Sequence, residues 1–355
     1  MVDCPEVPSN RLEKRRIDDR FRLGGEIKVF PEDFVVEEVW EDRVYTVDFS
    51  LLNRVVDGPS SFRDTKDYLH FTLVKRDWTT VKALQYMAKR LHVSLKRFNF
   101  SGMKDKRALT AQRVSAWRVE ARDLRRLRLK DVRVKDLGYS DERLTLGDAS
   151  GNRFTITIRN IPHGKAEIHR ILDEFGSVAR EGKIPNFFGP QRLGGGNVAI
   201  GKAIVDGDLK LATEILLQKV QPYLEKGSVE DLPDVFWIEK RVLQHLKNHS
   251  NDYAGALRKI PKKIRRIFTH SVQSQAFNEA LQEAVLKGDV PEVLEVEGFH
   301  VGRMPELSTH SIQRRGYLDV RGFSILRVED GVARIRFTLG SGEYATTFLS
   351  YLGVG

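Results

Sequence analysis

Apolar and polar residues alternate regularly in several segments up to residue 160 and again near the C-terminus, but not between these regions. In NRFTITIRN (152–160), Phe154, Ile156 and Ile158 lie on one side of a predicted strand and polar residues on the other. Further strands are predicted at 26–30, 33–39, 68–76, 97–102 and 333–339, and helices at 165–182 and 202–287. Strand-rich segments that flank a helical middle predict an α+β core with an insertion.

Two local signals add detail to this arrangement. Thr79 and Thr80 are suited to cap a helix that runs through Leu91, with an apolar face formed by Val81, Leu84, Met87, Ala88 and Leu91. After the last predicted strand, GSGE forms a turn and ATTFLSYL a short final helix. Residues 1–24 are charged and contain two prolines, which is typical of a loosely packed arm.

The charge balance indicates a polyanionic partner. Lys and Arg number 59 against 49 acidic residues, for a net charge of +10 among 355 residues. Such an excess favours nucleic acid as the partner. With Cys4 as the single cysteine, neither an intrachain disulfide nor a cysteine zinc site is possible. We expect a cytoplasmic location without a membrane anchor, since neither a signal core nor a long apolar run occurs.

Several enzyme classes lack support because their motifs are missing. The chain contains no HExxH, no HxE…PCxxC and no GxSxG pattern, and therefore no recognisable zinc or serine hydrolase site. Neither a GxxxxGK[ST] loop nor a GxGxxG fingerprint is present. The sequence therefore offers no recognisable nucleotide-binding motif either.

The segment IPNFFGPQRLGGGN (184–197) has two interpretations. Phe187 or Phe188 could stack on a base, and Gln191 and Arg192 could contact phosphate or base edges. The alternative is a buried aromatic turn whose glycines relieve backbone strain. The residues themselves favour this second interpretation.

The segment SGMKDKRALTAQ (101–112) sets one carboxylate, Asp105, among lysines and arginines. A turn acid that pairs with neighbouring cations is the ordinary explanation. A carboxylate kept ionised by those cations could instead act as a nucleophile or base. Spacing alone leaves both open.

Six segments, in order along most of the chain, resemble the motifs of the TruD family of tRNA pseudouridine synthases. They are KVFPEDFVVEE (28–38), NFSGMKDKRALTAQ (99–112), LGDASGNRFTITIR (146–159), IPNFFGPQRLG (184–194), SVQSQAFNEAL (271–281) and FTLGSGEYATTFL (337–349). Many members carry Tyr-Gln-Ser where this chain has Val272-Gln273-Ser274. The resemblance implies a pseudouridine-synthase core with a mixed, mostly antiparallel sheet and an inserted, mainly helical family domain.

The resemblance also implies domain boundaries and an activity. An N-terminal arm would cover 1–25, the catalytic core 26–183 and 321–355, and the inserted domain 184–320. The activity would be isomerisation of uridine in tRNA, at position 13 in the D-arm region, after the nucleotide flips out of the fold. Because the reaction adds and removes nothing, it needs no cofactor, and no obligatory protein partner is implied.

Site roles are implied position by position. Asp105 matches the catalytic aspartate and Lys28 an active-site basic residue that could keep it ionised. Phe154 matches the aromatic that packs on the target base, and Asn152 precedes it. Tyr344 stands where phenylalanine is usual in the uracil pocket. The remaining substrate-binding positions implied by the fourth motif are Phe187, Gln191 and Arg192.

Other assignments stay open at this point. Arg107, Arg113, Arg192 and the KKIRR run (262–266) are candidates for the RNA backbone, each with an ordinary surface role as the alternative. A non-catalytic RNA-binding module on the same scaffold would bind tRNA without turnover. A basic nuclease would cut the strand, but neither clustered acids nor a histidine pair supports it.

Overall fold

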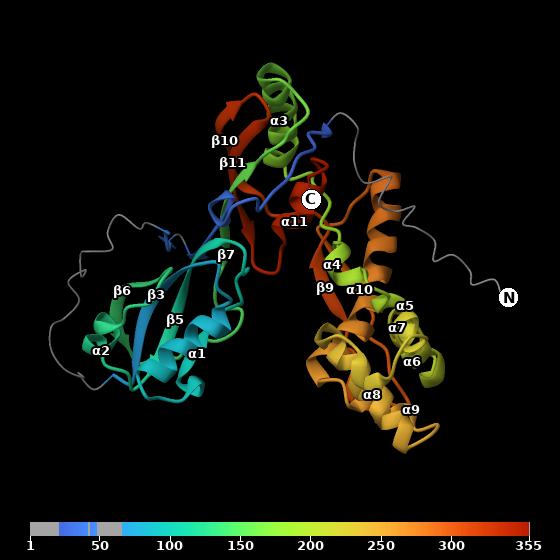
Figure 1. Ribbon diagram of the computed structural model, residues 1–355. Helices are drawn as coiled ribbons and strands as arrows, with labels where there is room; N and C mark the ends of the chain where they lie inside the picture. Colours follow the sequence, from blue (N-terminus) through green and yellow to red (C-terminus); the bar gives the residue numbers. More distant parts are fainter. Residues whose placement is uncertain (1–20, 42, 48–65, 355) are drawn as a thin grey trace. The chain divides into compact units, whose positions relative to one another are not determined.

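The computed structural model describes residues 21–41, 43–47 and 66–354, without the side chains of Pro190 and Gln191. Most of the predicted N-terminal arm, with Cys4, lies outside these residues. The chain forms two compact units, which Figure 1 shows coloured along the sequence: unit 1 combines Met1–Ile184 with Leu318–Gly355, and unit 2 is Pro185–Tyr317. Unit 2 overlaps the predicted insertion, 184–320, over nearly all of its length.

Unit 1 is built on a nine-stranded mixed sheet with the order β10-β11-β7-β1-β5-β3-β6, in which β2 also pairs with β1 and β4 with β5. The β1–β5 pair is parallel, and the other pairs in this sheet are antiparallel. The strands are β1 (Phe34–Trp40), β2 (Arg43–Val44), β3 (Tyr68–Arg76), β4 (Phe98–Phe100), β5 (Leu109–Trp117), β6 (Val132–Ser140), β7 (Gly151–Ile158), β10 (Arg321–Glu329) and β11 (Val332–Gly340).

Two large apolar cores stabilise this sheet, beside a small cluster of Val35, Val74, Leu109 and Ala111. One joins α3 and α11 to strands β7, β10 and β11, with Phe175 and Phe348 in contact at its centre. The other packs Leu84 and Met87 of α1 against the apolar face of β3. The helices of unit 1 are α1 (Thr80–Arg90), α2 (Ala121–Arg126), α3 (Lys165–Arg180) and α11 (Ala345–Ser350), with short 3-10 turns η2 (Pro31–Asp33) and η4 (Leu95–Arg97).

Unit 2 is mainly helical and has its own core. Its long helix α10 packs closely on α5, where a Cβ on Gly201 would come within 2.1 Å of the Phe268 carbonyl oxygen, so glycine is required there. The elements are α4 (Pro190–Leu193), α5 (Asn197–Val205), α6 (Leu209–Leu217), η5 (Gln218–Val220), α7 (Gln221–Leu224), η6 (Val229–Asp231), η7 (Asp234–Phe236), α8 (Trp237–Asn248), α9 (Tyr253–Arg258), α10 (Lys262–Lys287), β8 (Val293–Val296), η8 (Pro305–Leu307) and β9 (Ile312–Arg315).

The predicted fold class is confirmed: unit 1 is an α+β fold on a mixed, mostly antiparallel sheet. The strand 68–76 and the helix capped by Thr79, whose hydroxyl accepts from the Lys82 amide, are confirmed as well. Within the described part of the chain, no helix is both long and apolar enough to span a bilayer.

One predicted strand is wrong. Residues 26–30 form only an isolated bridge, between Glu26 and Arg159. The backbone of Lys28 has a φ of 60°, which turns the chain out of the extended conformation, and Pro31 then opens a 3-10 turn. Strands β2, β5, β6, β8, β9 and β10 were not predicted; in β5, β6 and β10, polar or charged residues interrupt the apolar pattern.

Candidate active site

Two rows of side chains cross one face of the unit 1 sheet. Residues directly opposite each other on neighbouring strands point to the same face. In one row, Phe337 pairs with Phe154, Phe154 with Val36, Val36 with Thr110, and Thr110 with Lys75. In the next row, Leu339 pairs with Asn152 and Asn152 with Glu38. The predicted residues Asn152 and Phe154 therefore share a face with two buried charged residues, Glu38 and Lys75, that the sequence did not single out.

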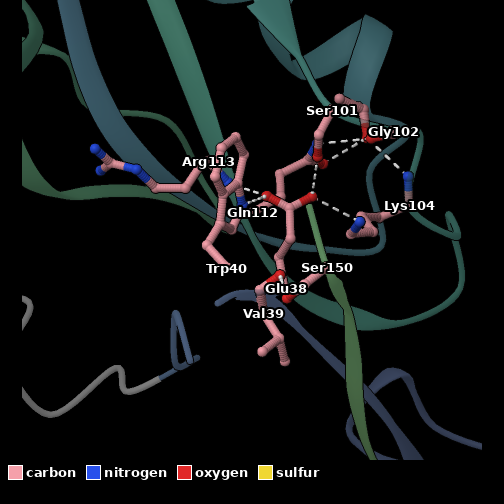
Figure 2. Close-up of polar contacts among 10 residues, drawn as sticks. Glu38, Val39, Trp40, Ser101, Gly102, Lys104, Gln112, Arg113 and Ser150 are labelled. Carbon is pink, nitrogen blue, oxygen red and sulfur yellow. Dashed lines mark hydrogen bonds and ion pairs between the residues drawn. The ribbon is translucent and has the colours of Figure 1, made fainter. Parts of the chain in front are cut away.

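Glu38 anchors the start of the loop that carries Asp105. Its side chain is fully buried, and Oε1 accepts hydrogen bonds from Ser101 Oγ at 2.6 Å and Lys104 Nζ at 2.8 Å. Oε2 accepts from Trp40 Nε1 at 2.9 Å and from the Arg113 amide at 2.7 Å. Figure 2 shows this carboxylate surrounded by its donors. Because all four donors point to one buried group, the loop is tied to β1 and β5 together.

Thr80 and Gln112 hold the main chain of the same loop. Gln112 Nε2 donates to the Gly102 carbonyl at 2.9 Å, and Thr80 Oγ1 donates to Gln112 Oε1 at 2.8 Å. The Lys104 amide in turn donates to Thr80 Oγ1 at 3.2 Å. Thr80 and Gln112 are both fully buried, so these bonds are shielded from water and help to fix the loop.

Asp105 itself faces solvent. Its side chain is 49% exposed, and Oδ1 lies 3.3 Å from Lys28 Nζ. The Lys28 ammonium also lies 4.1 Å above the ring of Phe34. The backbone of Lys28 has a φ of 60°, which is uncommon for lysine and carries a steric cost. The two predicted catalytic residues are thus brought into direct contact.

Two further contacts fix the main chain around this pair. Arg107 Nη2 donates to the Val29 carbonyl at 2.9 Å, which links the Asp105 loop to the segment that carries Lys28. Lys75 Nζ donates to the carbonyl oxygen of Asp105 at 2.7 Å from inside the protein. Burial lowers the pKa of Lys75 from 10.5 to about 8, an effect that the Asp105 carboxylate partly offsets.

Phe154 is both a core residue and a neighbour of the site. It is 6% exposed and stacks on Phe337, with ring centroids 5.4 Å apart. Its ring also meets the edge of Phe34 at 6.2 Å. Through Phe34 and the Lys28 ammonium above it, a continuous series of contacts joins Phe154 to Asp105.

Asn152 and Tyr344 have polar groups available near the same end of the sheet. Asn152 Oδ1 is buried and has no hydrogen-bond partner in the part of the chain that the structure describes. Tyr344 precedes the first residue of α11 and is 46% exposed. It follows the end of β11, where Gly340 pairs with Gly151, the residue before Asn152.

The three predicted positions of unit 2 are described separately. Phe187 is 3% exposed, which favours the interpretation of this segment as a buried turn, and its base-stacking role stays a prediction. Arg192 Nε donates to Ser274 Oγ at 3.3 Å, and burial together with Arg192 lowers the pKa of His270. The side chain of Gln191 lies outside the described residues.

Like Arg107 and Arg192, two further candidate phosphate-binding arginines make internal contacts. Arg113 donates to the Asp136 carbonyl at 3.0 Å and lies over the ring of Tyr45. Arg265, within the KKIRR run, is 8% exposed and bonds to the Ile260 carbonyl and to Glu306. The burial of Arg265 favours a structural role for it, whereas Arg113 is only half-buried and stays a candidate for the RNA backbone.

No group of three or more His, Cys, Asp or Glu side chains in the described residues is arranged to hold a metal ion. The side chains of the site supply an exposed carboxylate, an ammonium beside it, an amide oxygen without a partner among the described residues, and aromatic rings. Such a set suits acid–base or nucleophilic chemistry on a planar substrate.

A solved structure shares this fold. The crystal structure of a Methanosarcina mazei protein, described as "Putative tRNA pseudouridine synthase D (TruD)", superposes with a TM-score of 0.72 and 26% identity, over 94% of each chain. The fold class is thus the α+β fold of a pseudouridine synthase. A sequence model of the family described as tRNA pseudouridine synthase D (TruD) matches residues 15–295. The chain belongs to the TruD family.

Curated relatives agree with this assignment. A protein of Methanosarcina barkeri named "Probable tRNA pseudouridine synthase D" is 35% identical over 75% of this chain and 61% of its own length. One of the same name from Methanopyrus kandleri is 32% identical over 79% of this chain and 84% of its own. The chain thus spans less than two thirds of the length of the Methanosarcina barkeri relative.

Proposed function

We propose that the chain isomerises uridine to pseudouridine in tRNA, at position 13 in the D-arm region, with Asp105 as the catalytic carboxylate. Family membership supports the reaction. The observation that carries the residue assignment is the contact between Asp105 and Lys28 at 3.3 Å, on a loop anchored from within. An exposed carboxylate with a fixed main chain and a cation beside it can act on a substrate that arrives from solvent.

The surrounding side chains have distinct proposed roles. Lys28 orients the Asp105 carboxylate through the contact between Nζ and Oδ1. Asn152 Oδ1, which is buried without a partner among the described residues, can accept the N3–H of uracil. Phe154 supports the target base from the sheet, and the ring of Tyr344 lines its pocket. Phe187, Gln191 and Arg192 of unit 2 would contact other parts of the RNA.

Access to the target requires that the nucleotide leave its stack. A uridine in the D-arm region is enclosed by folded tRNA, so base flipping is the expected route to Asp105. The net charge of +10 favours binding to the RNA backbone. We propose that unit 2 is the family's inserted domain. The isomerisation adds and removes no atoms, so it needs no cofactor. We propose no obligatory protein partner. A tRNA substrate favours a cytoplasmic location.

Tritium release tests the reaction and its catalytic residue together. When uracil reattaches through C5, the hydrogen on C5 must leave, so tRNA transcripts labelled with tritium at that carbon release label into water on turnover. Wild type should release tritium, and Asp105→Asn should release none while it still binds tRNA. Asp141→Asn changes an exposed aspartate elsewhere in unit 1 and serves as the matched control.

The position is tested with a second transcript. A tRNA that carries cytidine at position 13 should release no label if this is the only target. Release from both transcripts would contradict the assignment to position 13 but leave the reaction in place. Tight binding without release by wild type would contradict the enzyme and support an RNA-binding module.

A further inference from the structure

Lys75 occupies a position that its strand pattern assigns to an apolar residue. In β3, Leu69, Phe71 and Leu73 alternate along one face and are buried in the core beneath α1. Lys75 is the next residue on that face and is itself fully buried. It pairs with Thr110 of β5 and Val132 of β6, so it lies inside the sheet and not at an edge. A lysine is almost never fully buried unless a partner compensates for the lost hydration.

The compensating partner is the main-chain carbonyl of Asp105, the predicted catalytic residue. Lys75 Nζ donates to the main-chain carbonyl oxygen of Asp105 at 2.7 Å, and no second side-chain hydrogen bond of Lys75 occurs among the described residues. A charge-assisted hydrogen bond of this kind is stronger than one between neutral groups. Because a carbonyl fixes the peptide plane that follows its Cα, this bond limits the directions in which the Asp105 side chain can point.

We infer that Lys75, in its ammonium form, is a positioning residue that holds Asp105 in the orientation required for turnover. The inference deepens the proposed function and rests on it. Lys75 acts through the main chain of Asp105 and does not touch the substrate. Lys28 contacts the carboxylate from the solvent side, whereas Lys75 contacts the carbonyl from the core.

The charges around Lys75 make this bond sensitive to pH. Burial lowers its pKa to about 8; the nearby Lys104 adds to the shift, while Asp105 and Asp77 oppose it. Below this pKa the ammonium donates a charge-assisted hydrogen bond to the Asp105 carbonyl. As the pH rises through 8, the amine becomes neutral and the bond weakens. Turnover should therefore fall on the alkaline side, in addition to any loss from deprotonation of uracil itself.

The first test measures the pH profile of tritium release at saturating tRNA. Lys75→Met should lower kcat by at least about tenfold at pH 7, with KM nearly unchanged, since misorientation of a catalytic group affects the chemical step. Lys75→Gln keeps an N–H donor without a titrating charge, so it should retain more activity than Lys75→Met and lose the alkaline fall near pH 8. Lys106→Met, which removes an exposed lysine next to Asp105, should keep that fall. A purely structural role would lower activity in both Lys75 variants without changing the shape of the profile.

The second test does not depend on activity. Hydrogen exchange of a peptide spanning 101–108 is compared at one pH between wild type, Lys75→Met and Lys106→Met. Within this loop, the Lys104 amide is bonded to Thr80 and the Ala108 amide to Lys106. In Lys75→Met these amides should exchange hydrogen at least about tenfold faster than in wild type, while the exchange rates of the amides of α1 stay unchanged.

The outcomes separate the two proposals. Unchanged exchange in Lys75→Met overturns the positioning role whether or not tRNA is modified. Faster exchange with unchanged turnover also overturns it. If wild type releases no tritium, the proposed function fails, and exchange alone decides whether Lys75 fixes the Asp105 loop.

Discussion

Lys104 Nζ lies 2.8 Å from Glu38 Oε1, and both side chains are withdrawn from solvent, with exposures of 8% and 0%. The pair joins the loop of the proposed catalytic Asp105 to β1, which lies beside the strand of Asn152 and Phe154. Three other donors complete the shell of Glu38. The pair is therefore a structural connection between the two proposed halves of the uridine site: the carboxylate and the base-binding face.

Glu38→Gln should be strongly destabilising. The substitution keeps the shape of the side chain but leaves Lys104 as a buried charge without a counter-ion, and such losses cost about 3–5 kcal/mol. The free energy of unfolding in urea measures the effect. Glu174→Gln is the matched control, because Glu174 forms an exposed ion pair with Arg170 and its loss should cost less than about 1 kcal/mol. Equal effects of the two substitutions would contradict a structural role for the buried pair.

The left-handed backbone of Lys28 predicts a difference between two truncations. Lys28→Gly and Lys28→Ala both remove the contacts with Asp105 and Phe34, but only alanine keeps the steric cost of a φ of 60°. The glycine variant should be more stable than the alanine variant by about 1 kcal/mol. Thermal or urea unfolding of the pair provides the measurement. An alanine variant as stable as the glycine variant would mean that the backbone relaxes at this position.

Both Lys28 truncations should also reduce turnover. Removal of a preorganised charged group beside the reacting carboxylate typically costs about 10²-fold or more in kcat. Tritium release at saturating tRNA measures this loss. A kcat near that of wild type in either variant would remove Lys28 from the proposed catalytic pair.

Alternation in the sequence was enough to predict β3 and to place Phe154, Ile156 and Ile158 on one face of β7. The same alternation also indicates that two charged residues are buried, which the sequence analysis did not predict. Phe34 and Val36 alternate toward the core, so Glu38 falls on the same buried face, and Lys75 follows Leu69, Phe71 and Leu73 in the same manner. A charged residue at an apolar position of a regular strand could have marked both as special.

The partners of these buried charges could not be predicted in the same way. Glu38 and Lys104 are separated by 66 residues, and in the sequence Lys104 looks like any other cation of a basic run. Strand β5 was missed for a related reason: Gln112, Arg113 and Ser115 interrupt its apolar pattern, yet Gln112 and Ser115 are buried. Tertiary hydrogen bonds that satisfy such groups are long-range, and local patterns do not encode them.

Lys75 predicts a pH dependence of stability that can be isolated by comparison with Lys75→Met. Its pKa is 10.5 ordinarily and about 8 in the folded protein, so between these values the unfolded chain binds a proton that the fold has lost. Raising the pH therefore stabilises the folded wild type, by up to about 1.4 kcal/mol per unit for one group. The variant lacks this group.

The free energies of unfolding of wild type and Lys75→Met are measured at pH 8.5 and 9.5. Their difference should move in favour of wild type by about 1 kcal/mol over this interval. Other titrating groups are common to both proteins and cancel. A difference that stays constant, or that moves in favour of the variant, would show that the pKa of Lys75 is not lowered in the fold.

Substitution of Asn278 in α10 should lower the stability of unit 2 around Phe188. Its Oδ1 accepts from the Phe188 amide at 2.8 Å, and its Nδ2 donates to the Phe188 carbonyl at 3.0 Å. The side chain is 1% exposed, so Asn278→Ala removes two buried hydrogen bonds to the main chain of Phe188, at a cost of about 2–4 kcal/mol. Asn248→Ala, at an exposed position of α8, should change stability by less than about 0.5 kcal/mol.

Hydrogen exchange locates this effect. The Phe188 amide should exchange faster in Asn278→Ala than in wild type, while the sheet amides of unit 1 keep their protection. Together with the free energy of unfolding, this outcome would establish that the asparagine of SVQSQAFNEAL holds the turn of IPNFFGPQRLG. Retained protection at Phe188 would mean that the turn is stable without it, and that a different contact fixes the segment that carries Phe187 and Arg192.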